Sequence, residues 1–82
     1  MSAEGSKTME YNSTYYLFDS MTFNDRHVWF QVIDSPIGNI YAIQYERPKP
    51  DMSLETKLFY SDFEKAEAYY KRTCKKMVDG RI

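Results

Sequence analysis

The chain has 82 residues, enough for one compact domain but too few for two hydrophobic cores, so a two-domain enzyme is excluded. Hydrophobic residues make up 43% and aromatic residues 17% of the sequence, which is more than disordered chains carry, so we expect a folded protein. The 11 basic and 12 acidic residues leave a net charge of −1, which argues against a dedicated nucleic-acid-binding protein.

The start of the chain and its single cysteine bear on location. Residues 1–13 are mostly small and polar without hydrophobic periodicity, which predicts a flexible N-terminal arm before a single domain at residues 14–80. The first ten residues lack the apolar run of a signal peptide, and no stretch approaches the roughly 18 apolar residues of a membrane span. Cys74 has no second cysteine to pair with, which favours a reducing compartment. We therefore expect a cytoplasmic protein with no membrane partner.

Three β-rich segments come first, at residues 14–22, 27–34 and 39–46. In the first of them, strict alternation would place Met21 on the same side as Tyr15 and Leu17, opposite Tyr16, Phe18 and Ser20. The residues between the segments include Asn, Asp, Pro and Gly, which favour tight turns. The three segments are therefore predicted to form antiparallel hairpins.

A shorter strand and a helix complete the predicted fold. Two prolines within residues 47–51 end the third strand, and residues 55–60 can form a fourth. Ser61 and Glu64 fit a capping box that would start a helix, and Gly80 is suited to end it. The apolar stripe of this helix comprises Phe63, Ala66, Tyr70, Cys74 and Met77. The order ββββα predicts an α+β domain, with a four-stranded antiparallel sheet and one C-terminal helix packed on one face.

The second and third strands carry bulky residues on both faces, yet one helix can cover only one face of a sheet. An uncovered aromatic face would exceed the few hundred Å² usual for the largest apolar patch of a monomer, so we expect it to contact a protein partner or a second copy. The alternative is that the N-terminal arm or residues 47–53 fold back over that face. The candidate partner-binding residues are Trp29, Tyr41, Ile43 and Tyr45 on the strands, with Asp25 and Asp34 on an acidic rim.

Single-stranded nucleic acid is the alternative partner. Bases could stack on Trp29, Tyr41 and Tyr45 while basic side chains follow the phosphate backbone. The basic residues in question gather near the end of the predicted helix and are Lys71, Arg72, Lys75 and Lys76. A solvated helix end explains the same cluster, because cations are favourable at the negative end of the helix dipole.

The sequence carries little that suggests catalysis. His27 near Asp25 could act as a base with an orienting acid, but no nucleophile is placed beside them. One histidine and one cysteine cannot build a tetrahedral metal site, and three isolated glycines form no phosphate-binding loop. We therefore expect no enzyme activity, catalytic residue, metal, cofactor or small-molecule substrate.

Residues 57–71 resemble the strand and helix that end WGR-type domains. The tripeptide that names that family is missing, because the corresponding region reads Tyr45-Glu46-Arg47-Pro48, and the resemblance implies no function. Three leucines against eight tyrosines is an unusual ratio that suggests a phage or mobile-element source. The leading prediction is a small regulator or inhibitor that docks on a larger protein or self-associates.

Overall fold

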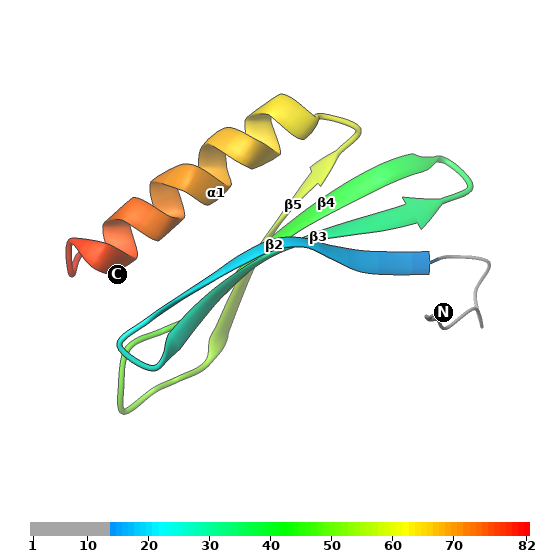
Figure 1. Cartoon of the computed structure of the whole chain (residues 1–82). Coiled ribbons are helices and arrows are strands. Elements are labelled where there is room, and N and C mark those ends of the chain that lie inside the picture. The colour runs from blue at the N-terminus through cyan, green and yellow to red at the C-terminus, as the bar shows by residue number, and fades with distance from the viewer. Residues whose placement is uncertain (1–13) are drawn as a thin grey trace.

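The computed structural model describes residues 14–82 and confirms the predicted ββββα fold. The elements, labelled as in Figure 1, are β2 (Thr14–Phe23), β3 (Arg26–Ser35), β4 (Gly38–Glu46), β5 (Leu54–Tyr60) and α1 (Phe63–Val78). The sheet order is β2-β3-β4-β5, and every neighbouring pair is antiparallel. The helix lies diagonally across one face of this twisted sheet, so the fold has two layers (Figure 1).

Two tight turns set the register of the sheet. Asn24 and Asp25 have φ angles of 52° and 65°, the left-handed conformation that two-residue hairpin loops require, and they join Phe23 to its partner Arg26. Gly38 has a φ of 119°, which a residue with a side chain rarely adopts, and it pairs with Ser35 across the second turn. Both predicted hairpins are therefore confirmed.

The core lies between the helix and the face of the sheet that the helix covers. Its buried hydrophobic residues are Val28, Phe30, Val32, Ile43, Ala66, Tyr70 and Met77. The predicted apolar stripe of the helix is thus the packed one, with Phe63 and Cys74 partly buried at its margins. Thr73 is also buried, and its hydroxyl donates to the carbonyl of Tyr69 over 2.8 Å, which satisfies the polar group inside the core.

The first strand departs from strict alternation because it contains a β-bulge between Leu17 and Asp19. The extra residue, Phe18, lies on the helix-covered face, where its ring is 5.0 Å from Phe30 and 5.4 Å from Phe63. The bulge shifts the residues that follow by one position, so Met21 packs against the core. The expectation that Met21 shares a side with Leu17 is therefore wrong.

The helix begins one residue later than the capping-box prediction. Asp62 is the N-cap, and its carboxylate accepts from the backbone N–H of Lys65 over 3.1 Å. Ser61 instead has a φ of 59° and belongs to the turn from β5 into the helix, so the predicted Ser61–Glu64 box is wrong. Gly80, with a φ of 75°, follows the C-cap Asp79 and ends the helix as predicted.

Candidate functional site

The face of the sheet away from the helix is the candidate site, and we call it the open face. Cross-strand pairing arranges its residues in rows that each take one residue from each strand. Three rows carry no charge: Tyr15-Ile33-Ile40-Tyr60, Leu17-Gln31-Ala42-Leu58 and Ser20-Trp29-Gln44-Thr56. A fourth row at one end, Thr22-His27-Glu46-Leu54, contains the Glu46 carboxylate. They lie opposite the core residues because successive side chains of a strand point to opposite faces.

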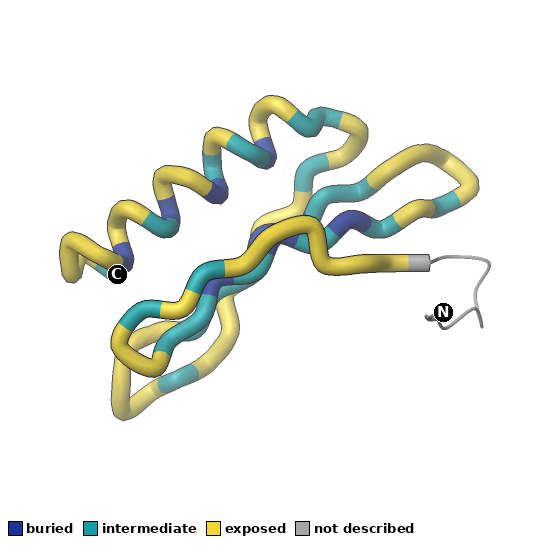
Figure 2. Tube along the Cα trace, in the orientation of Figure 1, coloured by how far each residue is buried: buried dark blue, intermediate teal, exposed yellow. Residues whose placement is uncertain are grey.

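Three of the four rows of the open face carry no charged residue and are largely apolar. Tyr15, Leu17, Leu58 and Tyr60 are exposed, so no segment within residues 14–82 shields these side chains, the loop at residues 47–53 included. Figure 2 shows the contrast, since the buried positions of α1 face the sheet while much of the outer strands is exposed. Whether the N-terminal arm covers the face lies outside the described residues. Sequence reasoning did not identify Leu17, Leu58, Tyr15 and Tyr60 because they lie on the two edge strands, whereas the prediction rested on the bulky residues of the two central strands.

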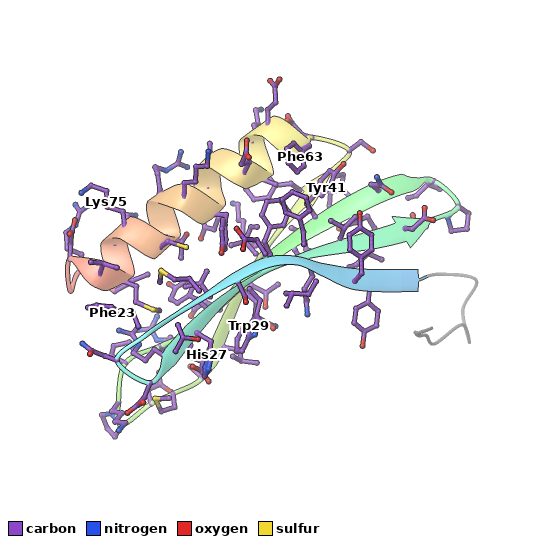
Figure 3. All side chains as sticks on the ribbon, viewed as in Figure 1. Phe23, His27, Trp29, Tyr41, Phe63 and Lys75 are labelled. Carbon is purple, nitrogen blue, oxygen red and sulfur yellow. The ribbon has the colours of Figure 1, made fainter. Side chains whose placement is uncertain are left out.

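The four strand residues predicted to bind a partner lie on different faces of the sheet. Trp29 lies on the open face, whereas Tyr41 and Phe63 lie between sheet and helix, as Figure 3 shows. Ile43 has no exposed surface and Tyr45 is partly buried against the core. The expectation that Ile43 and the two tyrosines share an exposed face with Trp29 is therefore wrong, because they occupy the positions that alternate with it in register.

The two acidic candidates lie at opposite ends of β3. Asp25 is in the turn before the strand, and Asp34 is next to its last residue, Ser35. Nine positions at about 3.3 Å each separate them by roughly 30 Å. Both residues are exposed, but they do not lie together as one acidic rim.

The basic residues of the helix and the half-buried indole of Trp29 lie on opposite sides of the molecule. Lys75 is on the outer side of α1, while Trp29 lies beyond the sheet (Figure 3). Lys71 is 3.9 Å from Glu67, Lys75 is 3.3 Å from Asp79, and the Arg72 guanidinium lies over the Tyr69 ring at 5.9 Å. A strand of nucleic acid stacked on Trp29 would have both layers of the fold between its bases and these cations. Their placement does not support a shared nucleic-acid site.

At one end of the open face, His27 is bound to a carboxylate other than the predicted Asp25. Glu46 Oε1 accepts from the backbone N–H of His27 at 2.8 Å and lies 2.9 Å from His27 Nδ1. This hydrogen bonding lowers the pKa of the Glu46 carboxyl below its usual range. The His27 ring also stacks on Trp29, with ring centres 5.3 Å apart. The arrangement fixes the position of the indole.

Arg26 joins three parts of the chain next to this pair. Its Nε and Nη2 donate to the carbonyl of Glu46 over 3.2 and 2.9 Å, and its Nη1 donates to Ile82 O over 2.7 Å. A pocket of about 390 Å³ lies nearby, lined by Tyr45, Arg47, Pro48, Gly80, Arg81 and Ile82. Arg47 contacts Asp51 and Glu55 at 3.1 and 3.2 Å, so its charge is balanced within the fold.

Cys74 and Tyr70 lie side by side between the layers. Burial raises the pKa of the Cys74 thiol, which keeps it protonated and poorly nucleophilic. Burial likewise raises the pKa of the Tyr70 hydroxyl, and neighbouring Cys74 and Asp19 raise it further. These groups are placed for packing rather than for nucleophilic attack.

The described part of the chain contains no cluster of three or more potential metal-ligating side chains. No helix within residues 14–82 is both long and apolar enough to cross a membrane. Comparisons of the chain with protein-family models, with curated proteins and with solved structures give no match.

Proposed function

We propose that this protein is a small non-enzymatic interaction module, a regulator or inhibitor, that docks its open face on a larger protein. The observation that carries the proposal is the set of three uncharged rows with exposed Tyr15, Leu17, Leu58 and Tyr60. Contiguous exposed apolar surface of this kind is typical of protein-binding sites.

The composition of the face suits such a role. Trp29 is held by its stacking on His27, and tyrosines stand at both ends of the first row. Rigid aromatic side chains with one polar end are enriched at interface hot spots, because they bury a large area at a small cost in side-chain entropy. The three rows carry no charge, and the Glu46 carboxylate at the end of the face is hydrogen-bonded to His27, so docking on the three rows desolvates no unpaired ion.

The structure also suggests how a partner would recognise the face. The partner should offer an apolar, weakly charged surface, and the complex should depend only modestly on salt, unlike a nucleic-acid complex. The unusual leucine and tyrosine usage leads us to include a phage or mobile-element regulator in this proposal.

The test is affinity purification with the intact chain as bait, followed by mass spectrometry and by titration of the purified partner. Leu58→Lys places a charge in the second row at a side chain that is 43% exposed, so the fold should tolerate it while binding weakens. Val78→Lys, at a 49% exposed apolar side chain on the helix, makes the same kind of change away from the open face and is the matched control. A partner that binds wild type and Leu58→Lys equally well would contradict the proposal.

A further inference from the structure

The outer edge of β2 is the second feature without a partner inside the described chain. β2 lies at one edge of the sheet, and four consecutive side chains on it are exposed: Tyr15 by 61%, Tyr16 by 56%, Leu17 by 52% and Phe18 by 48%. The strand TYYLFDSMTF contains no lysine, arginine or proline, and Asp19 is its one charged residue. Charged residues, especially lysine, and prolines are what edge strands normally use to prevent pairing with other chains.

The opposite edge shows that protection. β5 has the sequence LETKLFY, in which Glu55 and Lys57 place charges on the edge strand. Both charged residues are exposed. The two edges of the sheet therefore differ, and among the strands of residues 14–82 β2 is the edge strand without protecting charges.

The pairing of β2 with β3 determines which backbone groups of β2 are free. In a two-residue hairpin, the closing pair Phe23 and Arg26 exchanges hydrogen bonds, and alternate pairs beyond it do the same. Beyond the bulge, Tyr16 and Val32 form a hydrogen-bonded pair, and Tyr15 and Leu17 on either side of Tyr16 belong to non-bonded pairs. The N–H and C=O groups of Tyr15 and Leu17 therefore point away from β3. These two residues can therefore hydrogen-bond to a strand outside the sheet.

We infer that the protein forms a symmetric dimer in which β2 pairs antiparallel with β2 of a second copy, with Tyr16 facing Tyr16. In this register Tyr15 lies opposite Leu17 of the other copy, so the free groups of both residues meet and make about four main-chain hydrogen bonds. Antiparallel pairing also places the two Asp19 carboxylates on opposite sides of the centre, about 20 Å apart along the strands. A second copy thus supplies hydrogen-bond partners for the free backbone groups of β2 without bringing the two Asp19 carboxylates together.

The dimer would join the two open faces into one. Four strands about 4.8 Å apart and three rows about 6.7 Å apart give the uncharged part of one open face a projected area of roughly 400 Å². A stable protein interface uses about 800 Å² on each partner. In the dimer the two open faces adjoin on one side of an eight-stranded sheet, and together they reach about 800 Å². The dimer contact uses the strand edge rather than the open face, so it is separate from the docking proposed above.

The test is the mass of the full chain in solution by size-exclusion chromatography with light scattering, over about a hundredfold range of concentration. Wild type is expected to reach twice the 9.8 kDa mass of one chain. Tyr16→Lys should weaken the dimer by about tenfold or more, since the two lysines would face each other across the new strand pair. Leu58→Lys, on the open face and on the opposite edge strand, should leave the dimer unchanged.

Any of the following results would contradict a dimer formed through β2. A wild-type chain that stays monomeric removes the dimer, and a dimer lost in Leu58→Lys would be one built on the open face or on β5. A dimer that survives Tyr16→Lys uses another surface. As a second measurement independent of charge, Tyr16→Cys combined with Cys74→Ser should form a disulfide-linked dimer under mild oxidation, whereas Tyr60→Cys with Cys74→Ser should not.

Discussion

Truncation of two side chains on opposite faces of the sheet tests the assignment of the core. Ile43 on β4 is fully buried against the helix, while Leu58 lies on neighbouring β5, on the open face, and is 43% exposed. Ile43→Ala and Leu58→Ala each remove three carbons. The two substitutions therefore differ mainly in how deeply the removed carbons are buried.

The expected losses of stability follow from burial. Three buried carbons at about 0.8 kcal/mol each give about 2.4 kcal/mol for Ile43→Ala, and the cavity left beside Phe30 raises the cost to about 3–4 kcal/mol. Leu58→Ala removes only partly buried carbons and opens a gap that water can fill, so its cost should be about 1 kcal/mol. The difference of about 2–3 kcal/mol corresponds to roughly 8–24 °C in melting temperature for a domain of this size.

Urea unfolding of wild type and both variants, followed by fluorescence of the single tryptophan and by circular dichroism, measures these values. Equal losses of unfolding free energy for Ile43→Ala and Leu58→Ala would refute the assignment of the two faces. So would a larger loss for Leu58→Ala, because it would mean that the open face is covered in the folded protein.

Three further predictions concern local interactions. Asp62→Ala should cost about 0.5–2 kcal/mol in unfolding free energy by removing the helix cap, whereas Ser61→Gly should cost nothing because glycine suits the left-handed backbone there. Gly80→Ala should lower the unfolding free energy by about 1–2 kcal/mol, since alanine is strained at a φ of 75°, and thermal unfolding would detect it. The pKa of Glu46 is lowered by hydrogen bonds from His27, so its contribution to stability is present above its ordinary value of 4.5 and is lost as the pH falls through its folded value. Urea unfolding between about pH 6 and pH 2.5 should therefore show a weaker acid dependence in Glu46→Gln than in wild type.

The elements of the fold could be predicted because each is specified locally. Alternating β-formers, tight-turn residues and an apolar helical stripe act within a few positions of one another, and all five elements appear within one or two residues of their predicted bounds. The errors arose where one residue changes the pattern. The bulge at Phe18 moved Met21 to the other face, and nothing in the residue types of β2 signals an extra residue at that position.

The predictions of the helix N-cap and of the partner-binding residues were wrong for different reasons. Ser61 and Asp62 can both cap a helix, and the turn out of β5 decides between them by placing Ser61 in the left-handed region. Which face of the sheet the helix covers depends on long-range packing of Phe30 with Phe63 and Tyr70. Sequence alternation gives two sets of residues but does not say which set is outside, and the prediction therefore mixed Trp29 with residues of the core.

Stability alone does not account for the composition of the open face. The covered face already provides a continuous core with the helix, and exposed apolar side chains such as Leu17 contribute little to folding while lowering solubility. Polar residues at Leu17 and Leu58 would cost the fold about 1 kcal/mol each or less and would make the chain more soluble. The large apolar and aromatic side chains there fit the docking surface that we propose, and the edge of β2, which has no partner strand within residues 14–82, borders the same surface. Substitutions on the open face should therefore separate binding from folding, whereas substitutions at Ile43 should impair both.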